Sequence, residues 1–310
     1  MRKSEMLCLV VSKLQGLKIL ECVQQQLGAQ IQVITCDDRD DIGRTVFEAI
    51  REFCAEKNIN FLVLNGSSLS QYLIDHKPDL CLISGWYWMI ESRALTACRL
   101  GCLGVHNSLL PAFRGGAPLV WSVMSGEKNV GASLFIMGEG MDDGALIHQW
   151  TLEINETEYV DGILARLEEA VVSDLGVIIR EFLLGIRKSY PQSTNGISYA
   201  PTRRKKDSEI NWNDSAESLF NQCRALQNPF PLLFFKKNES EYQIRRLKKA
   251  PLKCYGPSGK VLAYIESGAV VSCGINTDGI ILTDVLDSGG TNAIPRKPFP
   301  IGAILANRKE

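Results

Sequence analysis

A histidine and an acidic residue are the side chains of this sequence best suited to acid–base chemistry. His106 opens the turn-rich segment 106–111, and Asp142 lies further along the chain in a glycine-flanked segment. A histidine can donate a proton or a hydrogen bond near neutral pH, and a carboxylate can orient it and favour its charged form. We predict that His106 and Asp142 form an acid–base pair at the ends of two strands, with Asp143 as the alternative acid. The structural alternative is a loop-capping histidine and an acidic surface turn.

The elements that must position this pair alternate between strand and helix. Continuous apolar runs predict strands at 6–11, 31–35, 61–64 and 80–84, and apolar residues at helical spacing predict helices at 17–27, 46–53 and 69–75. Residues 101–105 are expected to form a turn-rich segment before His106. This alternation predicts an α/β fold with a doubly wound, mostly parallel, Rossmann-like sheet, which binds ligands at the carboxyl ends of its strands. Because no G-x-G-x-x-G follows the first strand, a nicotinamide or flavin cofactor is not supported.

The domain organisation follows from a change in pattern near residue 189. Residues 1–188 are predicted to form the catalytic domain, and the polar segment 189–206, which contains proline and glycine, to form a linker. Residues 207–310 contain short apolar runs separated by glycines and are predicted to form a smaller, mainly β, OB-like domain.

Composition limits the class of protein. The 310 residues are 45% hydrophobic and 22% charged, which is typical of a soluble globular protein. There is no apolar run of about eighteen residues, so no membrane span is expected, and the N-terminus does not resemble a signal peptide. The ten cysteines include no C-x-x-C pair, which favours buried free thiols in the cytoplasm over disulfides or zinc. No metal is predicted.

Charge is distributed unevenly along the chain. Residues 201–310 hold 17 basic and 11 acidic residues, a net charge of +6, whereas the whole chain has a net charge of −1. A basic second half could bind nucleic acid or a phosphorylated ligand, or it could simply form a solvated surface.

Two segments around the predicted pair resemble a known family. Residues 106–118 (HNSLLPAFRGGAP) and 139–147 (EGMDDGALI) are similar to the signature of the folate-dependent formyltransferases, and residues 84–90, 210–212 and 224–231 resemble further parts of the family. The resemblance implies the formyltransferase fold and an enzyme that moves a formyl group from 10-formyltetrahydrofolate to a primary amine. By this resemblance, His106 is the catalytic histidine that stabilises the oxyanion, and Asp142 is the catalytic aspartate that orients His106 and assists proton transfer.

The resemblance also suggests which residues bind the ligands. The residues expected to contact the folate are Trp86, Trp88, Met89, Ile90, Gly140, Met141 and Asp143. Ser108 and Arg114 are expected to bind the acceptor, Arg114 through a phosphate or else as a structural anchor of its loop.

One position departs from the family. The family usually has an asparagine two residues before the histidine, whose amide holds the formyl oxygen, but this chain has Gly104 there. We expect Asn107 or a backbone N–H to replace that donor. Water is another replacement, and the remaining alternatives are a non-catalytic protein that binds folate or a sugar nucleotide, and an enzyme that hydrolyses the formyl donor.

The acceptor is predicted from the segment after the second strand. Methionyl-tRNA formyltransferases have a basic loop there, whereas residues 36–43 of this chain are short and contain four aspartates. Phosphate contacts supply much of nucleic-acid affinity, so we expect a nucleotide-linked amino sugar of surface-polysaccharide or lipopolysaccharide biosynthesis, with methionyl-tRNA as the alternative. Basic residues at 203–206 and 245–249 would favour tRNA. The second domain could position the acceptor or form a homodimer.

Overall fold

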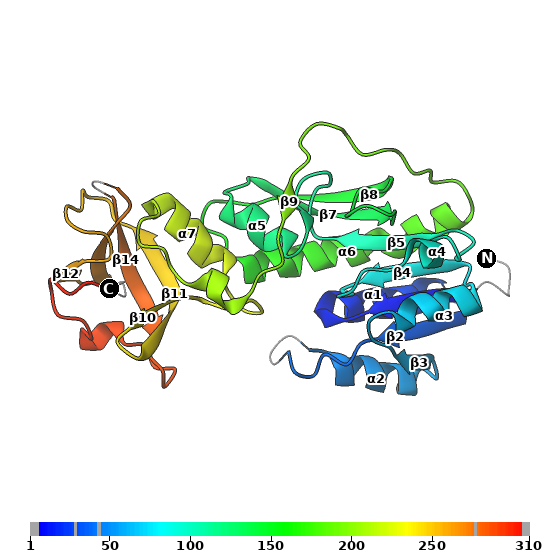
Figure 1. Cartoon of the computed structure of the whole chain (residues 1–310), viewed down its shortest axis with the longest axis horizontal. Helices are drawn as coiled ribbons and strands as arrows, with labels where there is room; N and C mark the ends of the chain where they lie inside the picture. The colour runs from blue at the N-terminus through cyan, green and yellow to red at the C-terminus, as the bar shows by residue number, and fades with distance from the viewer. Residues whose placement is uncertain (1–5, 28–29, 42–44, 276–277, 306–310) are drawn as a thin grey trace. The chain divides into compact units, whose positions relative to one another are not determined.

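The apolar run at the start of the chain forms a strand inside a seven-stranded sheet (Figure 1). The computed structural model describes residues 6–27, 30–41, 45–275 and 278–305. The sheet has the order β3-β2-β1-β4-β5-β7-β8, in which β1 to β5 are parallel and β7 and β8 are antiparallel. Its strands are β1 (Met6–Val11), β2 (Gln30–Thr35), β3 (Asn60–Val63), β4 (Leu80–Ser84), β5 (Cys102–His106), β7 (Asn129–Ile136) and β8 (Leu146–Glu153). The prediction of a doubly wound, mostly parallel sheet is confirmed.

Helices cover both faces of this sheet (Figure 1). The helices are α1 (Lys13–Leu27), α2 (Phe47–Glu56), α3 (Ser68–His76), α4 (Ser92–Leu95) and α6 (Val160–Leu183). Helices α3 and α4 pack in a buried cluster with Cys8 and Val10 of β1. Gly16 of α1 lies against Val11 of β1. Successive side chains of a strand point to opposite faces of a sheet, so Val11 lies on the face opposite to Val10. No helix within the described residues is long and apolar enough to cross a membrane.

The expectation of a turn-rich segment at 101–105 is wrong. Residues 102–106 form β5, which pairs with β4 on one side and with β7 on the other. The two glycines that suggested a turn serve different purposes, because Gly101 has a positive φ just before the strand whereas Gly104 lies within it. His106 is therefore the last residue of a buried strand.

The chain divides into two compact units, of which the sheet above belongs to the first. Unit 1 comprises Met1–Pro118, Asn129–Glu153 and Leu164–Pro201, and unit 2 comprises Leu119–Lys128, Ile154–Ile163 and Thr202–Glu310. Unit 2 contains a five-stranded antiparallel sheet of order β10-β11-β14-β13-β12. Its strands are β10 (Leu233–Lys237), β11 (Ser240–Lys249), β12 (Val261–Ile265), β13 (Gly268–Cys273) and β14 (Asp278–Leu286).

A buried arginine organises the helical part of unit 2. Most of α5 (Pro118–Met124) belongs to this unit, as does α7 (Ala216–Ala225), and two short turns, η1 (Lys205–Ser208) and η2 (Ile294–Arg296), complete it. Arg224 of α7 is 3% exposed and donates hydrogen bonds to the backbone carbonyls of Val123, Asn155 and Glu158. This arginine, which belongs to the family-like segment 224–231, therefore has a structural role.

The segment predicted as a linker begins as an ordered part of unit 1. Residues 189–201, called the strap below, pair with that unit at two places. Tyr190 forms an antiparallel bridge with Leu146, and β9 (Tyr199–Ala200) pairs in parallel with β6 (Arg114–Gly115). Because β6 belongs to the loop that follows His106, β9 of the strap pairs directly with that loop.

Candidate active site

His106 lies at the carboxyl end of β5 with both ring nitrogens near oxygen atoms. Its Nε2 is 2.9 Å from the carbonyl oxygen of Phe113, and its Nδ1 is 3.6 Å from Oδ2 of Asp142. A carbonyl oxygen only accepts, so Nε2 carries a hydrogen and donates it to Phe113. The distance of 3.6 Å is longer than a direct hydrogen bond. Nδ1 is therefore the nitrogen that can meet a reacting group.

The carboxylate beside His106 belongs to Asp142 and not to its neighbour Asp143. Asp142 has a left-handed backbone, with φ of 49°, and its Oδ2 accepts a hydrogen bond of 2.8 Å from the Gly115 N–H. Asp143 turns its carboxylate back over Gly140, where an added Cβ would lie 2.0 Å from Asp143 Oδ2. Gly140 therefore has to be glycine for Asp143 to fold in this way, and Asp142 is left as the acid of the predicted pair.

A glutamine of the strap binds the main chain of the loop that carries Asp142. Gln192 Nε2 donates to the carbonyl oxygens of Asp142 (2.7 Å) and Gly144 (2.8 Å), and its Oε1 accepts from Arg114 Nη2 (2.7 Å). Gln192 is absent from the residues predicted from the sequence, because it lies in a polar segment that carries no local signal of a site.

The backbone after His106 is occupied by the same strap. The N–H groups of Phe113 and Arg114 donate to Ser198, and the Gly116 N–H donates to Ala200. The Gly115 N–H is bound to Asp142, as described above. The backbone N–H groups of residues 113–116 all have partners, so they do not offer a ready donor to a formyl oxygen.

Gly104 faces an aromatic ring and not an empty space. It pairs with Phe135 of β7, and a Cβ added at Gly104 would lie 2.6 Å from Phe135 Cε1 and 3.3 Å from Met137 Cγ. The Phe135 ring also meets the His106 ring edge to face, with centroids 6.5 Å apart. The wall beside His106, where the family usually has an amide, is therefore apolar in this chain.

Asn107, the predicted replacement donor, is bound to another amide. Its Oδ1 accepts from Gln15 Nε2 at 2.9 Å, and its Nδ2 donates to Gln15 Oε1 at 3.1 Å. For Asn107 to hold a formyl oxygen, this amide pair at the start of α1 would have to open.

The two predicted acceptor-binding residues are both buried. Ser108 is 2% exposed, and its hydroxyl donates to the carbonyl oxygen of Ala112, so it supports the fold of its own loop. Arg114 is 7% exposed and is held by Gln192, while its Nε has no hydrogen-bond partner within the described residues. The contacts of Arg114 fit the role of a loop anchor.

The residues predicted to contact folate separate into an exposed group and a core residue. Trp88, Met89 and Met141 are between 41% and 72% exposed, whereas Ile90 is 8% exposed and packs in the core. Ser92 Oγ donates to Glu139, which joins the segment after β4 to the loop that carries Met141.

Trp86 provides a test of whether these residues fit a folate. Its Nε1 is buried without a partner in the part of the chain that the structure describes, and its ring meets that of Trp88 edge to face at 4.9 Å. An unpaired buried donor beside exposed apolar side chains fits a flat heterocycle with carbonyl or ring-nitrogen acceptors, as in a pterin. Among the described residues, no group of three His, Cys, Asp or Glu side chains could hold a metal ion.

The acidic segment after β2 is largely neutralised by a lysine. Lys13 Nζ lies 2.8 Å from Asp38 and 2.6 Å from Asp41, and Arg39 forms an ion pair with Asp37. Burial alone would lower the pKa of Lys13, but its hydrogen bonds to Asp38 and Asp41 outweigh that effect and raise it. Residues 42 and 43 of the predicted acidic loop lie outside the described residues.

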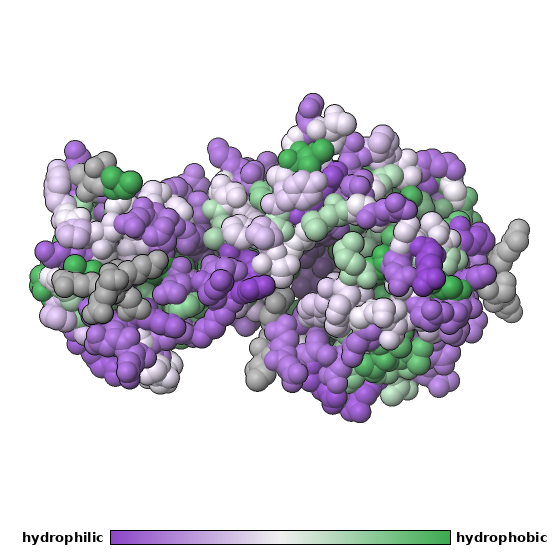
Figure 2. Space-filling model, in the orientation of Figure 1, coloured by the Kyte–Doolittle hydropathy of each residue, from purple (hydrophilic) through white to green (hydrophobic). Residues whose placement is uncertain are grey.

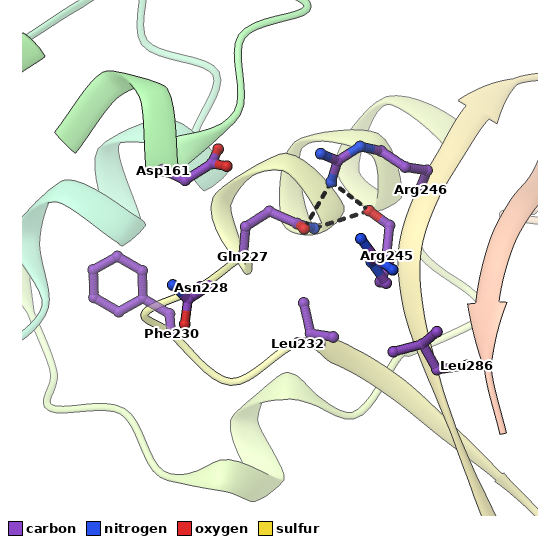
Figure 3. A pocket seen from close by; sticks show the side chains of 8 residues that line it. All are labelled: Asp161, Gln227, Asn228, Phe230, Leu232, Arg245, Arg246 and Leu286. Atoms are coloured by element: carbon purple, nitrogen blue, oxygen red, sulfur yellow. Dashed lines mark hydrogen bonds between the residues drawn. The ribbon is translucent and has the colours of Figure 1, made fainter. Parts of the chain in front are cut away.

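Unit 2 contains a pocket of about 310 Å³ (Figure 3), and three residues of the segment 224–231 that resembles the family line it: Gln227, Asn228 and Phe230. Arg246 Nη1 donates to Gln227 Oε1 at 2.7 Å and to the carbonyl oxygen of Arg245 at 2.9 Å. The Arg246 guanidinium also lies over the Tyr159 ring, 4.0 Å from its centroid. Arg246 is therefore built into the wall of the pocket.

Comparisons with known proteins show the family to which the chain is similar. A model of the formyl transferase family matches residues 10–175, and a model of the formyl transferase C-terminal domain matches residues 203–299. The methionyl-tRNA formyltransferase of Bacillus pumilus (strain SAFR-032) is 32% identical over 69% of this chain and 67% of its own. The methionyl-tRNA formyltransferase of Bacillus velezensis is 30% identical over 76% of this chain and 75% of its own.

Solved structures share the fold at lower identity. The sugar 3N-formyltransferase WlaRD, solved with dTDP and 5-N-formyl-THF, has a TM-score of 0.66 at 18% identity and covers 90% of this chain and 97% of its own. The N-formyltransferase from Helicobacter canadensis, in complex with folinic acid and dTDP-3-aminofucose, has a TM-score of 0.66 at 15% identity, over 89% and 98%. These likenesses extend across both units.

Proposed function

This chain belongs to the formyl transferase family, and we propose that it transfers the formyl group of 10-formyltetrahydrofolate to the primary amine of a nucleotide-linked amino sugar. The observation that carries the transfer step is the approach of His106 Nδ1 to Asp142 Oδ2, at 3.6 Å, at the carboxyl end of a parallel sheet. Ligands collect at this edge in doubly wound folds.

In the proposed reaction, the amine nitrogen attacks the formyl carbon and forms the new C–N bond. With both of its ring nitrogens protonated, His106 donates its Nδ1–H to the negatively charged formyl oxygen of the tetrahedral intermediate, while its Nε2–H stays bound to the Phe113 carbonyl oxygen. Asp142 orients His106 and accepts the proton of the attacking amine. The bond between the formyl carbon and N10 of the folate then breaks, and N10 leaves with the proton that Asp142 accepted from the amine.

The formyl donor is proposed on two grounds. Solved neighbours of the same fold were crystallised with 5-N-formyl-THF or folinic acid. In this chain, Trp86 Nε1, which has no hydrogen-bond partner among the described residues, and the exposed side chains of Trp88, Met89 and Met141 lie on the two loops next to the predicted pair. They would bind the pterin ring, while His106 and Asp142 would meet the formyl group.

The acceptor is proposed from the charges around the end of β2. Lys13 and Arg39, the cations of this segment that the structure describes, are both paired with carboxylates. A tRNA backbone needs several uncompensated cations along its path, and this segment supplies none among its described residues. A small sugar nucleotide requires far fewer such contacts.

Methionyl-tRNA is the second candidate acceptor, because one observation favours it directly. The relatives that are 32% and 30% identical to this chain are methionyl-tRNA formyltransferases. The acidic segment also opposes RNA binding less than its sequence indicates, because the carboxylates of Asp38 and Asp41 form ion pairs with Lys13.

Turnover of a panel of acceptors tests the proposal. The purified chain would be given 10-formyltetrahydrofolate with nucleotide-linked 3- and 4-amino sugars, dTDP-3-aminofucose among them, and separately with methionyl-tRNA. We expect formylation of an amino sugar and a loss of about 10²–10³-fold in His106→Ala, while the control His76→Gln keeps its rate. Turnover of the tRNA alone would replace the proposed acceptor by the second candidate.

Two further outcomes would contradict the transfer itself. Release of formate without any acceptor, abolished by His106→Ala, would identify a hydrolase. Folate binding without turnover or formate release would identify a binding protein.

A further inference from the structure

Gln192 is the one residue of the strap's outer stretch that turns toward the protein. Pro191 and residues 193–197 are exposed, whereas Gln192 is half-buried. Its side chain makes three hydrogen bonds, to the carbonyl oxygens of Asp142 and Gly144 and to Arg114 Nη2, all between 2.7 and 2.8 Å. A neutral amide has two donor hydrogens and one acceptor oxygen, so Gln192 uses both kinds of group in this position.

The residue that Gln192 holds has an unfavourable backbone conformation. Asp142 has a φ of 49°, in the left-handed region that residues other than glycine rarely occupy. Such a conformation persists only where surrounding contacts enforce it. Gln192 restrains the main chain on both sides of the Asp142 turn, because it binds the carbonyl groups of residues 142 and 144.

The strap also reaches the carboxylate of Asp142 by a second route. Ala200 pairs with Gly115, and the Gly115 N–H donates to Asp142 Oδ2. Gln192, near one end of the strap, thus restrains the main chain of Asp142. Ala200, near the other end, pairs with Gly115, whose N–H binds the Asp142 carboxylate. Gln192 and Arg114 connect the two routes, since Arg114 lies next to Gly115 and is bound to Gln192.

We propose that Gln192 is a positioning residue of the formyl-transfer site, which acts by holding the Asp142 carboxylate beside His106. This inference rests on the proposed function, in which Asp142 orients His106 and takes a proton. A shift of the carboxylate by about 1 Å is enough to lower a rate by about 10²-fold.

Two substitutions test Gln192 in different ways. Gln192→Leu removes all three hydrogen bonds at similar volume. Gln192→Glu keeps the shape and an acceptor for Arg114, but it presents a carboxylate oxygen to two carbonyl oxygens. Ser193→Ala is the matched control, because the Ser193 hydroxyl accepts a hydrogen bond from the Asn195 N–H within the strap and has no other partner among the described residues. Thermal unfolding of each full-length variant establishes that it is folded.

The first readout needs no acceptor. Hydrogen exchange of the Gly115 amide reports on its bond to Asp142 Oδ2. We expect this amide to exchange at least about 10-fold faster in Gln192→Leu and Gln192→Glu than in the native chain and Ser193→Ala. Unchanged exchange in both Gln192 variants would overturn the proposal, whether or not the chain turns over any acceptor in the panel.

The second readout is a double-mutant cycle on transfer to the acceptor that the panel identifies. We expect kcat to fall by about 10–100-fold in Gln192→Leu, with the KM for 10-formyltetrahydrofolate changed by less than about 3-fold. If Gln192 acts through Asp142, adding Gln192→Leu to Asp142→Asn causes little further loss. A full additional loss would mean that Gln192 only supports the fold. Absence of turnover in the native chain would refute the proposed function and leave the exchange experiment to decide on Gln192.

Discussion

At the scale of single residues, the wall beside His106 is the main difference between this site and the pattern it resembles. Gly104 is sterically required, because the Phe135 ring lies directly over it in the neighbouring strand. Asn107 is engaged by Gln15, and the backbone N–H groups of residues 113–116 are engaged by the strap and by Asp142. These contacts still allow His106 itself, a water molecule, or an opened Asn107–Gln15 pair to hold the formyl oxygen.

Restoring the family's asparagine alone is therefore expected to harm the protein. In Gly104→Asn, the new Cβ would lie 2.6 Å from Phe135 Cε1, and overpacking of this kind costs about 1–3 kcal/mol of unfolding free energy. Urea denaturation measures the loss. The double variant Gly104→Asn/Phe135→Ala provides the missing space, so its asparagine should be tolerated better than in the single variant relative to Phe135→Ala. An unchanged unfolding midpoint in Gly104→Asn would mean that the ring moves aside freely.

His148 gives a pH dependence of stability that is separate from catalysis. Burial lowers its pKa below the ordinary value of 6.5; Asp174 opposes that effect, and Arg187 adds to it. The unfolded chain therefore binds this proton more readily, and the stability present above pH 6.5 is lost as pH falls through 6.5 toward the folded pKa. We expect His148→Gln to reduce the fall in melting temperature between pH 7.5 and pH 5.5. An identical fall in the native chain and the variant would contradict this.

At the scale of elements, the sequence predicts best those strands and helices that form because of the apolar pattern of their own residues. The apolar runs at 6–11 and 80–84 correspond to β1 and β4, and the helical spacing at 17–27 corresponds to most of α1. The prediction for residues 101–105 is wrong because the strands that pair with a segment cannot be identified from the residues of that segment alone. Gly104 pairs with Phe135 of β7, whose ring occupies the space that a side chain at residue 104 would need.

The candidate site shows the same division. The residue types suggest the pair and the family resemblance assigns it to His106 and Asp142, and the structure brings these two side chains together. Gln192 could not be found in this way, because its contacts with Asp142 and Arg114 are distant in sequence and its surroundings have the composition of a linker. The pairing of Lys13 with Asp38 likewise depends on the sheet order, which places the ends of β1 and β2 side by side.

The loop after β5 depends on a serine in β7. Ser133 is fully buried; its hydroxyl donates to the Ser108 carbonyl oxygen and accepts from the Leu110 N–H and from Gln149 Nε2. Ser133→Ala leaves these buried groups without that partner, which costs about 1–3 kcal/mol. Urea denaturation should show this loss, while Ser173→Ala, at an exposed position in α6, should change stability by less than about 0.5 kcal/mol. Equal midpoints for the two variants would show that the loop does not depend on Ser133.

At the scale of the whole molecule, the positive charge of the second half is less available than the sequence indicates. Arg203 and Arg224 are half-buried or buried within unit 2, and Arg246 is stacked on Tyr159. Lys205 and Lys249 form ion pairs with Glu241 and Glu217. Polar residues cover most of the face seen in Figure 2, as expected for a solvated surface. The net charge of +6 thus does not by itself indicate a binding site for nucleic acid.

Charge reversal distinguishes the two acceptors at this scale. Lys206 and Lys248 are exposed, so Lys206→Glu/Lys248→Glu would change the electrostatic field of unit 2 without cutting into its core. For an amino-sugar acceptor, we expect kcat/KM to stay within about twofold and to depend weakly on salt, because a small ligand makes few phosphate contacts. For methionyl-tRNA, each lost phosphate contact would lower the magnitude of the slope of log(kcat/KM) against log[salt] by about 0.9. Rates measured between 50 and 200 mM salt separate these results, and a steep native slope that the double reversal reduces would refute the amino-sugar proposal.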